Sequence, residues 1–177
     1  ALKRNDFKNK FDKGNLEIHE SIGYADESLR LFFDGVKNEE WFKNTLFIIT
    51  GDHTQKSSVK KFQTIIGKYR VPLVFYHPTV DLSEFNFTGI SQHVDIPESV
   101  LDFLGIQVKE KLLFGQSIFK TNRRGYNLNY ASGRYFIYKP PFLATLHQDK
   151  LKVELFGTNK SASDCCDQNK KKILLCV

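Results

Sequence analysis

The sequence predicts an α/β fold: a sheet flanked by helices, followed toward the C-terminus by a small antiparallel sheet. An amphipathic segment beginning near residue 21 precedes two short, strongly apolar segments at 45–50 and 71–76, as expected of helices packed on a sheet. Beyond residue 120 the pattern changes to short alternating segments separated by turn residues. We therefore expect part of an α/β domain in residues 1–120 and a small antiparallel β subdomain in residues 121–177.

Length and composition are those of a globular chain that can bury a core. The chain has 177 residues, of which 41% are hydrophobic and 16 are Phe, and no stretch has the low hydrophobicity and high charge of a disordered segment. No apolar run approaches the roughly 18 residues of a membrane span, and the first residues lack the apolar core of a signal peptide. Because the chain contains no Met, we expect it to be a fragment of a longer protein.

Net charge and cysteine content say little about which partners the chain binds. The formal net charge of +6 favours anionic partners such as phosphate groups, lipid headgroups or nucleic acid, although a solvated, lysine-rich surface is the simpler explanation. The three cysteines, two of them adjacent, form no disulfide framework, so we expect free thiols.

The first helix is predicted from Ser21 onward. Apolar side chains recur there every three or four positions and form one stripe: Ile22, Ala25, Leu29, Phe32, Phe33 and Val36. After this helix, residues 39–44 are expected to form a short turn in which Trp41 and Phe42 pack inward.

Two short apolar segments are predicted to be buried strands. Residues 45–50 are continuous and rich in β-formers, which suits a central strand buried on both faces, as in parallel sheets. Residues 71–76 form the second strand, and Pro72 is tolerated near its start because the first residues need not donate hydrogen bonds. Residues 54–69 are polar and rich in Lys, and we predict a loop there.

A second helix is predicted around residues 95–105. Asp95 is a suitable N-cap residue, and Pro97 lies in the first turn, where its missing N–H is harmless. Gly105 supplies a left-handed residue at the C-terminal end. The face expected to be buried consists of Val100, Leu101 and Leu104.

The last third is predicted to form an antiparallel meander. Turn residues at Gly133, Pro140-Pro141 and Gln148-Asp149 separate three expected strands. These strands are residues 134–138, 142–147 and 151–156, and a final helix is expected at residues 163–177.

Asp52-His53 is the sharpest candidate for a functional site. The pair follows directly after a predicted strand, and ligands in open α/β sheets bind at the carboxyl ends of strands. A carboxylate and an imidazole placed there can share a divalent metal ion, since oxygen suits Mg²⁺, Mn²⁺ or Ca²⁺ and nitrogen suits Zn²⁺ or Mn²⁺. The alternative is a hydrogen-bonded pair in a loop.

Four ordered blocks of the sequence resemble motifs of sulfatases and of lipoteichoic acid synthase-like phosphoglycerol transferases, in the alkaline phosphatase superfamily. The blocks are residues 21–53, ending in Asn-Thr-Leu-Phe-Ile-Ile-Thr-Gly-Asp-His; 70–73, with Val-Pro-Leu; 91–106, with His-Val-Asp-Ile-Pro; and 114–119, Phe-Gly-Gln-Ser-Ile-Phe. Four ordered blocks are far more specific than any one of them. The resemblance implies that residues 1–120 are the C-terminal part of a sulfatase-like domain with an alkaline phosphatase-like sheet.

The resemblance also implies a metal-dependent activity for the parent protein. Asp52 and His53 are expected to bind the catalytic metal ion, whereas the nucleophile and other ligands lie in the family's N-terminal half, which has no match here. No catalytic residue is therefore expected in this chain, and the fragment alone is expected to be inactive. With its N-terminal remainder, the parent is expected to hydrolyse or transfer a phosphate or sulfate ester.

Details of the motif favour one branch of this family. Thr54 stands where sulfatases commonly have Gly, which favours a phosphoglycerol transferase-like enzyme over a sulfatase. Such transferases resemble membrane-anchored enzymes whose catalytic domain faces outside the cytoplasm, so the resemblance implies an extracytoplasmic location for the parent.

Two further residues are candidates for substrate binding. His93 could be a metal or phosphate ligand if its loop converges with His53, the alternative being an ordinary loop histidine. Lys56 could contact a phosphate or sulfate group, the alternative being a solvated loop. The other histidines belong to no constellation and are interpreted as structural: His19, His77 and His147.

Two other classes of function stay open. A non-catalytic anion-binding module would have the same fold without a metal. Residues 123–138 contain the mixture of Arg and Tyr seen in nucleic-acid binders. The edge of a meander explains this mixture more simply, so no nucleic-acid partner is expected.

Overall fold

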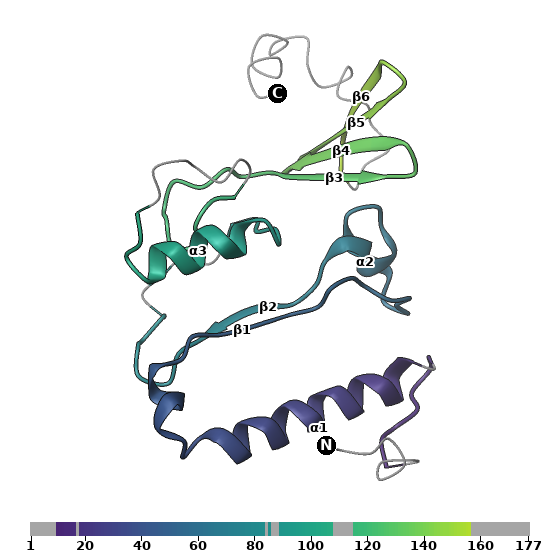
Figure 1. The fold of residues 1–177 in the computed structure, drawn as a ribbon. Helices are drawn as coiled ribbons and strands as arrows, with labels where there is room; N and C mark the ends of the chain where they lie inside the picture. Colours follow the sequence, from purple (N-terminus) through teal and green to yellow (C-terminus); the bar gives the residue numbers. More distant parts are fainter. Residues whose placement is uncertain (1–9, 17, 84, 86–88, 108–114, 157–177) are drawn as a thin grey trace. The chain divides into compact units, whose positions relative to one another are not determined.

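The computed structural model describes residues 10–16, 18–83, 85, 89–107 and 115–156 (Figure 1). The chain forms two compact units, Ala1–Glu84 and Phe85–Val177. The first unit contains helices and a two-stranded sheet, and the second contains a helix and a four-stranded sheet. No helix among these described residues combines the length and apolarity needed to cross a membrane.

Helix α1 (Ile18–Val36) confirms the first predicted helix and begins three residues earlier. Its last turns pack on the sheet of the first unit through aromatic rings, as α1 runs alongside that sheet (Figure 1). The ring of Phe33 lies 5.0 Å from that of Phe47 and 5.8 Å from that of Tyr76, centroid to centroid. The predicted stripe is nevertheless incompletely covered, since Ile22 is 56% exposed and Phe32 is 46% exposed.

The opposite face of α1 carries a row of ion pairs. Both carboxylate oxygens of Glu27 accept hydrogen bonds of 2.8 Å from Arg30, and these bonds lower the pKa of Glu27. Asp34 accepts from Lys37 and from Arg30, which lowers its pKa as well. Because the side chains of Arg30, Asp34 and Lys37 are about half exposed, the pairs add little to stability, and this face of α1 is the one turned to water.

A 3₁₀ turn, η2 (Glu40–Asn44), follows α1 and leads into the sheet. Phe42 is buried, at 7% exposure, whereas Trp41 is 46% exposed. The predicted inward packing therefore holds for Phe42 and is wrong for Trp41. The Phe42 ring lies 5.2 Å from that of Phe47, so this turn packs on the beginning of β1 mainly through Phe42.

Strands β1 (Phe47–Thr50) and β2 (Leu73–Tyr76) confirm the two predicted strands but not their expected environment. They pair antiparallel, with Phe47 opposite Tyr76 and Thr50 opposite Leu73, so the expectation of a parallel central strand was wrong. Parallel pairing needs a crossover, usually through a helix. The connection here holds only two short helical turns, and the chain folds back on itself.

The segment between these strands, predicted to be a loop, contains two such turns: α2 (Lys60–Gln63) and η3 (Gly67–Tyr69). The Thr64 hydroxyl donates to the Lys61 carbonyl at 3.1 Å and accepts from the Gly67 N–H at 2.9 Å. A Cβ at Gly67 would overlap the Lys61 carbonyl oxygen, so only glycine permits this close approach.

Helix α3 (Asp95–Phe103) in the second unit confirms the second predicted helix but buries a different face. Asp95 and Ser99, one turn apart, are 2% and 0% exposed, whereas Leu104 is 58% exposed. Asp95 is the first helical residue rather than the N-cap residue. Its carboxylate accepts the N–H groups of Gln92 and Gln116, at 2.8 and 2.9 Å, and so anchors the helix to other segments.

The end of α3 has the predicted left-handed glycine. Gly105 has φ of +66°. Its N–H donates to the Asp102 carbonyl at 3.1 Å, and the Ile106 N–H donates to the Leu101 carbonyl at 2.9 Å. These two bonds are those of a Schellman motif, which satisfies carbonyl groups that the helix itself leaves without partners.

Replacing Gly105 with Ala is expected to destabilise the second unit by about 1 kcal/mol, because an L-residue is strained in the left-handed region. A Cβ there would meet no atom within 4 Å, so backbone strain alone is tested. Gly125→Ala is the matched control, since it also has open space and lacks a positive φ. Urea unfolding followed by amide hydrogen exchange measures the stability of the two variants. Equal destabilisation by Gly105→Ala and Gly125→Ala would show that backbone strain is not the cause.

The four-stranded sheet confirms the predicted antiparallel meander and adds one strand. Its order is β3-β4-β5-β6. The strands are β3 (Asn127–Ala131), β4 (Arg134–Lys139), β5 (Phe142–His147) and β6 (Lys150–Leu155). Tight turns with positive φ connect β3 to β4 at Ser132-Gly133 and β5 to β6 at Gln148-Asp149. The helix predicted at 163–177, and the cysteines with it, lie outside the described residues.

Candidate functional site

The Asp52-His53 pair lies directly beyond the end of β1, where the chain leaves the sheet at Gly51. The two side chains are 88% and 65% exposed. One carboxylate oxygen of Asp52 accepts the backbone N–H of His53 at 2.8 Å. The other, Oδ2, lies 3.4 Å from His53 Nε2, so both side chains turn toward the same point.

A neighbouring carbonyl group sets the orientation of the His53 ring. Nδ1 lies 3.1 Å from the carbonyl oxygen of Thr54, and because that oxygen can only accept, this contact is a hydrogen bond in the tautomer that carries its proton on Nδ1. In the neutral ring the lone pair is then on Nε2, the nitrogen that faces Asp52. Metal-binding histidines usually have this kind of partner on their second nitrogen.

The donor atoms of the pair fit part of a divalent metal site. Two atoms bound to one ion at about 2.1 Å lie roughly 3.0–3.4 Å apart, and Oδ2 of Asp52 and Nε2 of His53 are separated by 3.4 Å. Among the residues that the structure describes, no group of three or more His, Cys, Asp or Glu could hold a metal ion. Asp52 and His53 would therefore hold such an ion together with ligands from elsewhere.

A hollow of about 260 Å³ opens beside His53 in the first unit. Its walls come from the first turn of α1, the loop after β1, the two short turns and the residues before β2. The lining residues are Ile18, His19, Ile22, His53, Thr54, Gln55, Lys56, Ser57, Phe62, Gly67, Arg70, Val71 and Pro72. The structure thus brings the candidate Lys56 together with His53, and adds His19 and Arg70, which the sequence had not indicated.

His93, the other candidate, is an exposed residue of the turn that leads into α3. Its carbonyl oxygen accepts the Ile96 N–H at 3.1 Å. Because His93 belongs to the second unit and His53 to the first, a common role for them stays a prediction.

Around Asp95 the structure reveals a buried polar cluster that the sequence did not predict. Arg124 forms an ion pair with Asp95 in which their side chains are 15% and 4% exposed. The backbone N–H of Arg124 donates to Oε1 of Gln116 at 2.6 Å. Gln92 binds both backbone groups of Leu128 in β3, at 2.8 and 3.2 Å. Hydrogen bonds to Asp95 therefore connect the start of α3 with Gln92 and Gln116, which belong to two of the sequence blocks.

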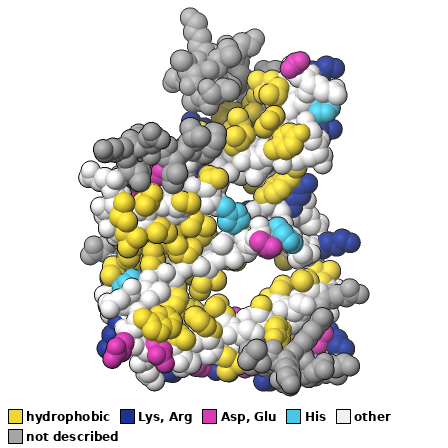
Figure 2. All heavy atoms as spheres, viewed as in Figure 1, with side chains coloured by type: hydrophobic (Ala, Val, Ile, Leu, Met, Phe, Trp, Pro, Cys, Tyr) yellow, Lys and Arg dark blue, Asp and Glu magenta, His cyan; other side chains and the backbone are white. Residues whose placement is uncertain are grey.

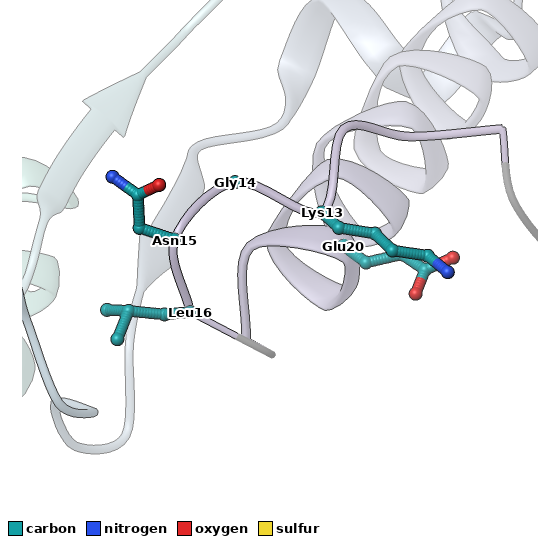
Figure 3. Close-up of a pocket in the computed structure, with 5 residues that line it drawn as sticks. All are labelled: Lys13, Gly14, Asn15, Leu16 and Glu20. Atoms are coloured by element: carbon teal, nitrogen blue, oxygen red, sulfur yellow. The ribbon is translucent and has the colours of Figure 1, made fainter.

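A larger hollow of about 430 Å³ lies at the beginning of α1, and neither Asp52 nor His53 lines it. It is lined by Lys13, Gly14, Asn15, Leu16 and Glu20. Figure 3 shows that Asn15 and Leu16 point to one side and Lys13 and Glu20 to the other. Since these side chains do not converge, we assign no function to this hollow.

Comparison with known proteins identifies the family. Residues 17–106, just over half of the chain, match the family described as Sulfatase, and the chain belongs to this family. It is 23% identical over 117 residues to "Lipoteichoic acid synthase-like YvgJ" of Bacillus subtilis (strain 168), a match that covers 58% of this chain and 19% of that protein. The chain therefore spans about a fifth of the length of this relative.

A solved structure confirms the fold class. The crystal structure of a protein in the alkaline phosphatase superfamily from Vibrio parahaemolyticus superposes with a TM-score of 0.68 at 17% sequence identity. The match covers 86% of this chain and 37% of that one. The predicted fold, part of an alkaline phosphatase-like α/β structure with a small antiparallel sheet, is thus confirmed, apart from the antiparallel pairing of β1 and β2.

Proposed function

We propose that this chain supplies half of the metal centre of an enzyme that hydrolyses or transfers phosphate or sulfate esters. The observation that carries the proposal is the convergence of Asp52 Oδ2 and His53 Nε2, 3.4 Å apart, at the end of β1. Membership of the sulfatase family supports the class of ester. A bound Mn²⁺, Mg²⁺, Ca²⁺ or Zn²⁺ ion would supply Lewis-acid polarisation of the ester and activation of a nucleophile.

The residues of this chain have separate tasks in that centre. Asp52 offers a carboxylate, and the Thr54 carbonyl fixes the His53 ring so that Nε2 stays available. The Thr54 hydroxyl in turn donates to the Lys68 carbonyl, a bond that the glycine usual in sulfatases could not make. Lys56, in the wall beside His53, would attract the anionic substrate, and His93 stays a candidate for a further contact.

Within this class, a phosphoglycerol transferase-like activity is our first proposal. The similarity to a lipoteichoic acid synthase-like protein and the bond made by Thr54 support it. The match to the sulfatase family supports sulfate ester hydrolysis as the second candidate. We also propose that the parent works at the extracytoplasmic face of a membrane, by analogy with such transferases.

We further propose that the chain depends on the remainder of its parent protein. The first unit leaves several large apolar side chains open to solvent, among them Ile22, Phe32, Trp41 and Val74, each about half exposed. Figure 2 shows yellow hydrophobic side chains reaching the surface in several places. Exposed apolar surface of this kind marks interaction sites, and the match to the relative covers only 19% of that protein.

The test compares the 177-residue chain with its full-length parent. Both are assayed with bis(p-nitrophenyl) phosphate and p-nitrophenyl sulfate, in the presence of Mn²⁺ or after EDTA treatment. We expect metal-dependent cleavage of the phosphate diester by the parent and no turnover by the chain, because the described part of the chain offers two candidate ligands where catalytic sites need at least three. Preferential cleavage of the sulfate would favour a sulfatase; turnover by the chain alone would contradict the incomplete site.

A further inference from the structure

The hollow beside His53 has a lining whose charges are of one sign. Lys56 and Arg70 line it together with the imidazole groups of His19 and His53. No Asp or Glu of the described residues is in the lining. The hollow is therefore suited to an anion.

The rest of the lining is mostly apolar. It is formed by Ile18 and Ile22 of α1, Phe62 of α2, and Val71 and Pro72 before β2. A volume of about 260 Å³ is slightly below the usual range for sites that hold drug-sized molecules. The fitting ligand is thus small, with an anionic group joined to a compact apolar or carbon-rich group.

Hydrogen bonds hold the walls of this hollow in place. The loop that carries Lys56 is fixed before it by the Thr54 hydroxyl, which donates to the Lys68 carbonyl. It is fixed after it by the Gln63 side chain, which donates to the Ser57 carbonyl at 2.8 Å. Gly67 lines the hollow where no Cβ would fit. The cationic groups are consequently presented by an organised wall.

We propose that this hollow binds an organic phosphate or sulfate: a second anionic group of the substrate, next to the ester that reacts. The position beside that ester rests on the function proposed above; the binding of the anion does not. Arg70 would hold the anion through paired N–H donors, and Lys56 would add a mobile positive charge. The substrate class narrows to esters that carry a further phosphate or sulfate group.

The experiment titrates phenyl phosphate and inorganic phosphate into the ¹⁵N-labelled chain in EDTA, followed by NMR. We expect shifts at residues 53–57 and at Arg70, and phenyl phosphate should bind roughly tenfold more tightly because about 55 Å² of its apolar surface is buried. Arg70→Gln and Lys56→Gln should each weaken binding about fivefold. Lys60→Gln, a nearby exposed lysine outside the lining, should change it less than about twofold.

Each outcome decides for or against the proposal. Equal affinity for the two phosphates, or equal effects of Lys60→Gln and Arg70→Gln, would overturn it. Circular dichroism establishes that the variants are folded, which is expected because both cationic side chains are on exposed residues. EDTA removes metal ions, so the affinity for the phosphates is measured independently of any metal binding by Asp52 and His53. A separate Mn²⁺ titration measures that metal binding.

Discussion

Replacing Asp52 with Asn in the parent enzyme should lower its turnover of ester substrates roughly a thousandfold. A metal ion acting as a Lewis acid stabilises a transition state by several kcal/mol, and each 1.4 kcal/mol is a factor of ten in rate. The Asn side chain keeps the size of Asp52 but loses the charge that pairs with a cation. His53→Gln should have an effect of similar size, because it removes the nitrogen that lies 3.4 Å from the carboxylate.

Asp26→Asn is the matched control for this change, because Asp26 is an exposed carboxylate on α1. Asp26→Asn should leave the turnover and the metal affinity within about twofold of those of the unchanged protein. In the isolated chain, Mn²⁺ binding measured by electron paramagnetic resonance should be weak and lost in the Asp52 variant. Equal Mn²⁺ affinity in the Asp52 and Asp26 variants would show that the pair is not a metal site.

Asp95→Ala is expected to destabilise the second unit by about 3–5 kcal/mol, the usual cost of breaking a buried ion pair. Asp95 is 2% exposed and accepts hydrogen bonds from Gln92 and Gln116 as well as from Arg124. Its removal leaves the Arg124 guanidinium, 15% exposed, without its carboxylate. A loss of this size is a large part of the total stability of a domain. Amide hydrogen exchange across α3 and β3–β6 measures it.

Asp102→Ala is the control for Asp95, since Asp102 is an exposed residue of the same helix. It should change the stability by less than about 0.5 kcal/mol. Exchange in β1 and β2, which belong to the first unit, should be unaffected by the Asp95 change. Similar losses for both variants would mean that the buried pair contributes no more than a surface carboxylate.

The sequence correctly predicted the elements that are determined by residues close together in the chain. The stripe of apolar residues gave α1, and Gly105 at φ of +66° gave the end of α3. The turns at Gly133 and Gln148-Asp149 divide the meander at the expected positions, with positive φ at each. These features depend on residues that are close together in the sequence, so the sequence carries enough information to place them.

Features set by distant partners were not predicted. The apolar pattern of 45–50 indicates a strand but not the direction of its neighbour, and the pairing of β1 with β2 proved antiparallel. The sequence predicts a buried face of Val100, Leu101 and Leu104 on α3. It does not reveal the burial of Asp95 and Ser99, because this depends on partners about 20 residues away in the chain: Gln116 and Ile118. Hydrophobic pattern alone cannot anticipate a polar face that is satisfied by such contacts.

In the candidate site, too, the sequence predicted the local feature and missed those that depend on the fold. Asp52 and His53 are adjacent in sequence, so their proximity needed no fold to be predicted. The hydrogen bond between the His53 ring and the Thr54 carbonyl, and the presence of Arg70 in the same hollow, depend on how the chain returns from β1 to β2. His19 was interpreted as structural because nothing near it in the sequence suggested otherwise, yet it also lines that hollow.

Trp41 gives this chain a built-in optical reporter. It is the single tryptophan among 177 residues, it is 46% exposed, and its ring lies 6.3 Å from that of Phe47, the first residue of the strand that ends before Asp52. Indole emission shifts to shorter wavelength when water is excluded from the ring. The association that we propose between this chain and the remainder of its parent protein can therefore be followed in solution without a label, at the opposite end of β1 from the Asp52-His53 pair.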